Sequence, residues 1–292
     1  MKMRTHLIVL VVGATGSVGR LVVEQAVARG HTVRALVRAS TRDAAVVRQL
    51  DPAAQCVVGD LTRAVTLAEA VAGIDAVVFT HGSSGGGKAE AERVDYGAVR
   101  NVLAALNGRR DVRIALMTSI GVTNRTGAYN RSTEIHDWKR RGERLLRASG
   151  LPYTIVRPGW FDYNAADQLK LHFLQGDTRQ AGDPSDGAVS RRQIAQVLVA
   201  SLGCESARGK TLELVAERGP AQTDLEPMFA ALISDAPKEA NGFDAVGDSA
   251  NMPVEQEPQR VREALQAAMA RSAEPTPQAV PSLPTRTQGA HS

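Results

Sequence analysis

Aromatic residues are scarce in this 292-residue chain, where Phe, Trp and Tyr together make up 4% of positions. Its 35 lysines and arginines only slightly outnumber its 31 acidic residues, and they are spread along the sequence. Proteins that bind nucleic acid need a concentrated basic surface, usually with aromatic rings that stack on bases. The composition therefore argues against a nucleic-acid partner, whereas a modest positive excess suits a small polyanionic ligand.

Cysteines and long apolar runs are also few. The two cysteines, Cys56 and Cys204, have no metal-like spacing, and we expect both to be reduced and buried. No stretch is apolar over the length of a transmembrane helix, and residues 1–4 lead straight into the first strand without a secretion signal. These features predict a cytoplasmic protein with no metal site and no membrane segment.

A glycine-rich turn is the most informative motif that is present. It reads Gly13-Ala14-Thr15-Gly16-Ser17-Val18-Gly19, directly after the apolar run 7–12 and directly before a helical pattern. Between a strand and a helix, three glycines allow a tight turn, close approach to a pyrophosphate, and close packing of the helix. The N-terminus of that helix would attract the same anion. The motif predicts a dinucleotide site that includes Gly13, Thr15, Gly16, Ser17, Val18 and Gly19.

The residue at the end of the next strand bears on the choice of dinucleotide. NAD sites usually have an acid there, which binds the ribose hydroxyls, but this sequence has Arg38. A guanidinium suits a 2′-phosphate, so we expect NADP(H), with NAD(H) second. After the third strand, Asp60 is expected either to accept from the adenine amino group or to cap the helix that follows. Leu61 would lie beside it in the cofactor site.

Short β-rich runs alternate with amphipathic helical patterns, as a parallel sheet covered on both faces requires. Strands are expected near 6–12, 32–37, 55–58, 75–80, 112–118, 152–156 and 211–216, and helices near 17–29, 42–50, 64–72, 89–107, 132–149 and 190–202. The pattern predicts an α/β fold with a Rossmann-type doubly wound parallel sheet. Ligands bind at the carboxyl ends of such strands, so the loops that follow them would share one crevice.

The domain organisation is inferred from changes in composition. Residues 1–235 form the expected dinucleotide-binding domain, in which a segment from about 157 to 190 would cover the substrate. Residues 272–292 are rich in Pro, Ser, Thr and Gln and are expected to be disordered, because they cannot bury enough apolar surface. Between them, residues 236–271 would form a small C-terminal extension with a short helix that buries Val261, Leu265 and Met269.

Several segments together resemble the short-chain dehydrogenase/reductase superfamily. They are the glycine turn, Gly59-Asp60-Leu61, the helix that contains Asp95, Met117-Thr118-Ser119-Ile120-Gly121, and Leu151-Pro152-Tyr153-Thr154-Ile155-Val156-Arg157-Pro158-Gly159. More closely, residues 5–235 are similar to its atypical NAD(P)H-binding subgroup. That subgroup includes sugar-nucleotide epimerases, flavin and biliverdin reductases, and redox-sensing regulators similar to NmrA. The resemblance implies the fold and the dinucleotide, and leaves the reaction open.

The resemblance also implies a catalytic set. The superfamily uses an Asn, a Ser, and a Tyr that stands four residues before a Lys. Here Ser119 and Lys139 match the serine and the lysine, and Asp95 stands at the asparagine position. The tyrosine position is Ile135, which has no proton to exchange. His136 is a candidate for the missing acid, because imidazole titrates near neutral pH.

The remaining candidates concern contacts with the cofactor and the substrate. Lys139 would donate to the nicotinamide-ribose hydroxyls, unless it is only a surface partner of Glu143. Thr80, at the end of the fourth strand, and Pro158, after the sixth, would lie close to the cofactor. Trp160, Phe161 and Tyr163 suit a flat or aromatic ligand, although core packing explains aromatic residues equally well.

These expectations lead to one function and two alternatives. We expect an NADP(H)-dependent oxidoreductase that transfers hydride to a small aromatic, quinone or flavin-like acceptor, since such acceptors need little acid assistance. The alternatives are a non-catalytic NADP(H) sensor that binds a partner protein, and an NAD(P)-dependent sugar-nucleotide epimerase, which Ile135 disfavours. The expected partner is a small-molecule substrate, and the protein would be a monomer or a homodimer.

Overall fold

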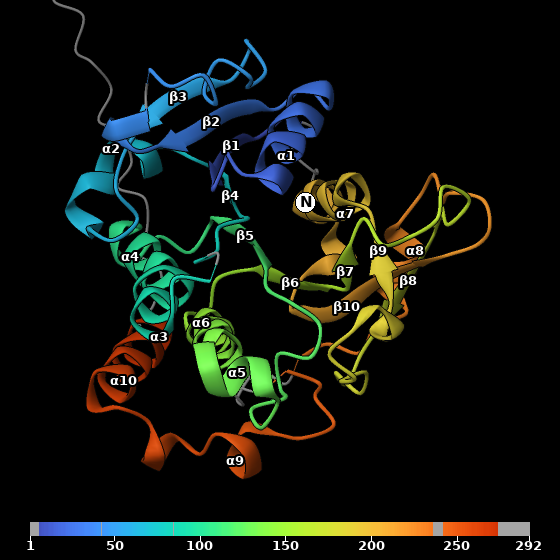
Figure 1. The fold of residues 1–292 in the computed structure, drawn as a ribbon. Helices are drawn as coiled ribbons and strands as arrows, with labels where there is room; N and C mark the ends of the chain where they lie inside the picture. The colour runs from blue at the N-terminus through green and yellow to red at the C-terminus, as the bar shows by residue number, and fades with distance from the viewer. Residues whose placement is uncertain (1–5, 42, 84, 236–241, 274–292) are drawn as a thin grey trace, which may run out of the picture.

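The computed structural model describes residues 6–41, 43–83, 85–235 and 242–273. At its centre lies an eight-stranded sheet in the order β3-β2-β1-β4-β5-β6-β10-β8 (Figure 1). Seven of the strands run parallel, and β8 pairs antiparallel with β10. The sequence prediction of a Rossmann-type parallel sheet is confirmed. The strands are β1 (Ile8–Val12), β2 (Thr32–Val37), β3 (Gln55–Val58), β4 (Ala76–Phe79), β5 (Arg113–Met117), β6 (Tyr153–Pro158), β8 (Lys170–Leu174) and β10 (Lys210–Glu217).

Helices cover both faces of this sheet, which is why its central strands are continuous apolar runs. On one face, α1 (Ser17–Ala28) and α7 (Arg191–Gly203) enclose the first core (Figure 1). On the other, α2 (Ala68–Val71), α4 (Gly97–Ala105) and α6 (Ile135–Ala148) enclose the second. The short helices are α3 (Lys88–Glu90), α5 (Ala128–Thr133), α8 (Glu226–Ala230) and α9 (Asp248–Asn251), and α10 (Gln259–Ala273) packs outside α6.

Four of the expected helices differ from the helical structure that is observed. Residues 43–50 form successive turns, because the N–H groups of Ala44, Val47 and Leu50 each bond to the carbonyl three residues earlier. The helix expected at 89–107 is divided by a π-helical segment, Ala91–Tyr96. The one expected at 132–149 is divided at Glu134, whose φ of 56° is left-handed. The helix expected near 64–72 is a 3₁₀ turn, Ala64–Leu67, followed by α2.

Some residues also lie in environments that the sequence did not predict. Cys56 is exposed and lies in β3, a strand at the edge of the sheet. In α10, Val261 and Leu265 are buried, whereas Met269 is 46% exposed and Ala268 takes the buried position instead. The described helices include none that is both long and apolar enough to cross a membrane.

The segment expected to cover the substrate contains regular structure. It includes β8, and a second, two-stranded sheet in which β7 (Trp160–Phe161) pairs parallel with β9 (Ala188–Val189). Gly187 has a φ of 115°, and a Cβ there would overlap Val215 of β10. The covering segment therefore packs directly against the main sheet, and it places β7 at the carboxyl edge where the site lies.

Candidate functional site

The glycine turn between β1 and α1 depends on its glycines for steric reasons. Gly13 has a φ of 82°, and a Cβ on it would lie 2.8 Å from the backbone nitrogen of His81. A Cβ on Gly19 would overlap the Gly13 carbonyl oxygen. Larger residues at these positions would push α1 away from β1. The backbone of the turn therefore packs tightly against His81 and against the start of α1, as expected for a dinucleotide-binding turn.

The start of α1 is well suited to an anion. Gly16 is the N-cap and supplies no side-chain hydrogen bond, and the first turn of α1 has no acidic residue. Ser17 is exposed, Thr15 is half-buried, and Val18 points into the core, so that Val18 offers its backbone alone. Helix N-termini with these properties bind phosphate through N–H groups and the helix dipole. The residues present therefore fit a dinucleotide pyrophosphate.

The residues expected at the adenosine end lie at the ends of the next two strands. Arg38 directly follows β2 and is exposed, so its guanidinium is accessible to a ligand. Asp60 accepts from the backbone N–H of Thr62 at 2.9 Å and from its hydroxyl at 2.7 Å. These hydrogen bonds lower the pKa of the Asp60 carboxyl. The Leu61 carbonyl accepts from Asn101 at 2.7 Å, which fixes the loop.

Thr80 and His81 form the floor of the crevice after β4. The Thr80 hydroxyl donates to the carbonyl of Val12 at 3.0 Å, which joins β4 to the start of the glycine turn. His81 is buried with its ring edge-on to Phe79, 5.4 Å between centroids. Burial, reinforced by Lys139, lowers the pKa of His81 to about 4. His81 was not among the residues predicted from the sequence.

Asp95 and Lys139 form a buried ion pair beside this floor. The Lys139 ammonium lies 2.8 Å from Asp95 Oδ1, and the two side chains are 13% and 0% exposed. Burial opposes ionisation of Asp95, but Lys139, together with Ser83 and His81, lowers the pKa of the carboxyl overall. Glu143 instead pairs with Arg157 at 2.6 Å, so the alternative of a surface pair between Lys139 and Glu143 is wrong. Lys139 therefore belongs to the crevice.

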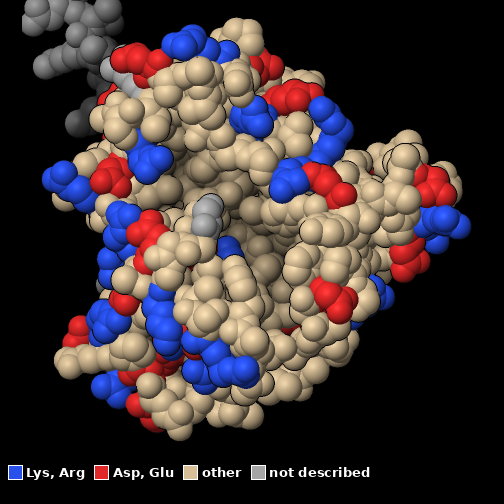
Figure 2. All heavy atoms as spheres, viewed as in Figure 1, with Lys and Arg blue, Asp and Glu red and all other residues tan. Residues whose placement is uncertain are grey.

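A cavity of about 580 Å³ opens close to this pair, because it is lined by His136, three residues before Lys139 on α6, and by Tyr129, whose pKa is raised by burial and by the Asp95 carboxylate. Figure 2 shows the face of the molecule hollowed at its centre, with mostly uncharged residues around the hollow. Aromatic rings from the covering segment, Trp160, Phe161 and Tyr163, line the cavity. Pro158 also lines it, as do Ser119, Ile120, Gly121, Asn124, Tyr129, His136, Gly159, Gln180, Gly182, Asp186 and Arg191.

Two polar atoms in the cavity wall have no hydrogen-bond partner in the described part of the chain: Ser119 Oγ and His136 Nδ1, both buried. Asn130 of α5 positions His136, because its side-chain oxygen accepts from the His136 backbone N–H at 3.0 Å. Burial lowers the pKa of His136, so its ring is neutral near pH 7. A buried polar atom without a partner is costly, and a ligand oxygen or N–H group would satisfy both atoms.

Ile135 lies apart from these groups. It is 5% exposed and packs in an apolar cluster with Tyr96, Trp138 and the buried residues of α10. It is absent from the cavity wall that contains its neighbour His136. The catalytic position of the superfamily tyrosine therefore serves packing in this chain, and His136 is the residue of α6 that reaches the cavity.

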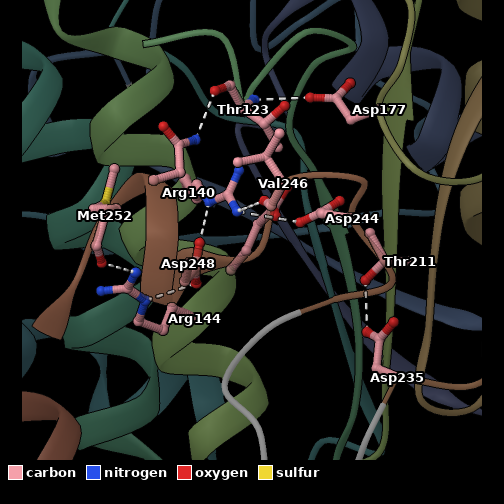
Figure 3. A network of polar contacts seen from close by, with 12 residues as sticks. Thr123, Arg140, Arg144, Asp177, Thr211, Asp235, Asp244, Val246, Asp248 and Met252 are labelled. Atoms are coloured by element: carbon pink, nitrogen blue, oxygen red, sulfur yellow. Dashed lines mark hydrogen bonds and ion pairs between the residues drawn. The ribbon is translucent and has the colours of Figure 1, made fainter.

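Three arginines of α6 pair with acids of the C-terminal extension, and a fourth pairs with Asp235 just before it. None of these contacts was predicted from the sequence. Arg140 and Arg144 both pair with Asp248, and Arg144 also binds the Met252 carbonyl (Figure 3). Arg141 and Arg144 pair with Glu257, and Arg147 pairs with Asp235. The sequence gives no local signal for these contacts, because the acids lie about a hundred residues further along.

The comparison with protein families assigns the chain to a dinucleotide-binding family. A family model described as NAD(P)H-binding matches residues 13–205, from the first glycine of the turn to the residues after α7. The chain belongs to this NAD(P)H-binding family. The matched residues include the glycine turn, the Asp95–Lys139 pair and all the residues that line the cavity.

The chain is similar to a chloroplast protein, to a reductase and to a solved structure described as an epimerase or dehydratase. Protein TIC 62 of Pisum sativum is 29% identical over 257 residues, which are 79% of this chain and 47% of the pea protein. The chain thus spans about half of that relative. Sanguinarine reductase of Eschscholzia californica is 25% identical, covering 78% of this chain and 97% of the reductase. A solved structure, described as a putative NAD-dependent epimerase/dehydratase from Bacillus halodurans, is 25% identical with a TM-score of 0.64, over 77% of this chain and all of that one.

Proposed function

We propose that the protein is an enzyme, an NADP(H)-dependent oxidoreductase that transfers hydride to a small, flat acceptor of aromatic, quinone or flavin-like structure. The observation that carries the proposal is the cavity beside the Asp95–Lys139 pair. Its wall combines aromatic rings with two unpartnered polar atoms, Ser119 Oγ and His136 Nδ1. Rings would hold a planar acceptor, and the polar atoms would hold one of its oxygens. The resemblance to a protein named sanguinarine reductase supports a reductase.

The positions of Lys139, Ser119 and His136 suggest a role for each in the proposed reaction. Bound NADPH would supply the hydride. Lys139, positioned by Asp95 at 2.8 Å, would donate to the nicotinamide ribose. Ser119 would donate to the acceptor oxygen, and His136, neutral near pH 7 because burial lowers its pKa, would hydrogen-bond the same group. Protonation from solvent can follow hydride transfer to a quinone or flavin, so the absent tyrosine is tolerable.

The choice of NADP(H) rests on Arg38, exposed at the end of β2. The cytoplasmic location expected from the low cysteine content remains part of the same proposal. A sugar-nucleotide epimerase is less well supported despite the name of the Bacillus halodurans structure, because Ile135 is buried in packing where the base would stand.

The test is NADPH consumption in the presence of a panel of quinones, flavins and aldehydes, after calorimetry has shown that NADPH binds. Ser119→Ala should lower kcat by about a hundredfold and leave the Kd for NADPH within about twofold. Ser132→Ala, an exposed serine of α5, is the matched control and should change neither. Binding of NADPH with no consumption across the panel would overturn the proposal in favour of a non-catalytic sensor.

A further inference from the structure

One arginine joins the glycine turn to the covering segment. Arg191 is the first residue of α7, and its Nε donates to the hydroxyl of Ser17 at 3.0 Å. The same guanidinium forms an ion pair with Asp162 and lies 5.2 Å from the ring centre of Phe161. Asp162 also accepts from the Arg191 backbone N–H at 2.9 Å. Arg191 thus contacts both the expected pyrophosphate position and the residues directly after β7.

Ser17 lies at the position where the phosphate groups of the cofactor are expected. Ser17 is the first residue of α1, whose N-terminus carries no acid and no side-chain cap and so remains open to an anion. A guanidinium bonded to the Ser17 hydroxyl is within reach of a phosphate bound there. Arginine pairs with phosphate through two parallel hydrogen bonds, which are stronger than neutral ones. The Arg191 side chain is 34% exposed, so it can change partner without being pulled from the core.

We propose that Arg191 binds the pyrophosphate of the dinucleotide from the α7 side, and that it exchanges its ion pair with Asp162 for the phosphate when the cofactor binds. The exchange frees Asp162, which directly follows the cavity residues Trp160 and Phe161. Cofactor binding is thereby transmitted to the substrate cavity, and by linkage a ligand in the cavity changes the affinity for the cofactor. This inference rests on membership of the NAD(P)H-binding family and does not depend on the proposed hydride transfer.

Calorimetry on neighbouring arginines tests the phosphate contact. Arg191→Ala should weaken NADPH binding by about tenfold to a hundredfold, the loss expected for charge-assisted hydrogen bonds. Arg192→Ala is the matched control, because Arg192 is 61% exposed and pairs with Glu24 at 2.9 Å. It should stay within about twofold. Adenosine 2′-monophosphate lacks the pyrophosphate, so its affinity should be the same in the parent and in Arg191→Ala.

Two outcomes would overturn this contact: an unchanged affinity of Arg191→Ala for NADPH, or an equal loss for NADPH and adenosine 2′-monophosphate. The second would mean that the variant damages the fold. Asp162→Asn adds an independent check, because it removes the competing carboxylate and should tighten NADPH binding. Weaker binding in Asp162→Asn would show that the ion pair holds Arg191 in place for the phosphate, contrary to an exchange of partners.

Tryptophan fluorescence tests whether cofactor binding changes the substrate cavity. The chain has two tryptophans, so in a Trp138→Phe background the emission comes from Trp160 in β7. Saturation with NADP⁺, chosen because it does not absorb the tryptophan emission, should shift this emission. The shift should be lost when Arg191→Ala is added and NADP⁺ is again saturating. An equal shift with and without Arg191 would show that the cavity does not respond through this arginine.

Discussion

His81 and Asp95, two neighbouring groups beside the glycine turn, titrate under the influence of one ammonium group, Lys139. Burial lowers the pKa of His81 to about 4, and the adjacent positive charge adds to the effect. The same charge lowers the pKa of the Asp95 carboxyl against the effect of burial. At neutral pH the three residues therefore carry a single ion pair and a neutral ring, which leaves the crevice floor without net charge.

The neutral state of His81 should make stability depend on pH. Its pKa is about 4 in the folded protein and near 6.5 when exposed, so between these values the unfolded chain binds more protons. Stability should therefore be fully present above about pH 6.5 and should fall by roughly 3 kcal/mol towards pH 4. Urea unfolding at several pH values should show a smaller fall for His81→Phe than for the parent.

The control is His6, an exposed histidine. His6→Asn should retain the parent's pH dependence between about pH 6.5 and 4. Superimposable stability profiles for the parent and His81→Phe would mean that another group is responsible for the acid lability.

Arg38 provides a second prediction at this scale. Arg38→Ala should weaken NADPH binding by about tenfold to a hundredfold, because a charge-assisted hydrogen bond to the 2′-phosphate is lost. NADH has no such phosphate and should bind the variant as it binds the parent. Equal losses for both nucleotides in calorimetry would show that Arg38 does not read the phosphate.

At the scale of elements, α6 is unusual because nearly all of its surface is buried. Its apolar residues pack toward α4 and α10, while Arg140 and Arg144 are fully buried on another side against the C-terminal extension. Such arginines are stable only while their acidic partners remain, since an unpaired buried charge is costly. The extension thereby holds the helix that carries Lys139 and His136.

Loss of one acid should therefore be severe. Asp248 is 4% exposed and pairs with both Arg140 and Arg144. Asp248→Ala should lower the free energy of unfolding by about 3–5 kcal/mol, measured by urea denaturation. Asp167→Ala removes an exposed pair, with Arg218 82% exposed and Asp167 61% exposed, and should cost less than about 1 kcal/mol. Similar losses in the two variants would contradict the importance of burial.

Helices and strands were predicted more accurately where neighbouring residues alone determine them. The parallel strands were predictable because continuous apolar runs between turn residues mark buried strands. Ser119, Asp95 and Lys139 could be assigned to one site because they match the catalytic positions of the superfamily that the sequence resembles, and Ser119 also lies just after the carboxyl end of β5. The break at Glu134, the burial of Arg140 and Arg144, and the environment of His81 could not be predicted. The burial of the two arginines and the environment of His81 depend on residues brought together from distant parts of the chain.

At the scale of the whole molecule, the C-terminal extension is part of the architecture although it follows the last strand. Residues 242–257 supply acids to α6, and α10 then covers the cluster of Ile135 and Trp138. The side-chain amide of Asn251 also donates to the Thr123 carbonyl at 2.8 Å, close to the cavity residues that follow Ser119. The expected domain boundary at 235 therefore does not separate two independent bodies.

Truncation tests this organisation. A chain that ends at residue 273 should keep its Tm within a few degrees and bind NADPH normally, because the composition of the residues beyond it offers little apolar surface to bury. A chain that ends at residue 234 lacks Asp235, Asp248 and Glu257 and should not unfold cooperatively in circular dichroism. A cooperative, NADPH-binding chain of 234 residues would show that the extension is dispensable.

The pairing of α6 with the extension also determines the order in which parts of the protein can fold during synthesis. Arg144 leaves the ribosome 104 positions before its partner Asp248, which at about 5–20 residues per second is a wait of roughly 5–20 s. During that time the sheet strands and glycine turn can form, while α6 still has arginines that only water can solvate. The nascent chain should therefore become protease-resistant in two stages, with the helix that bears Lys139 and His136 secured in the second.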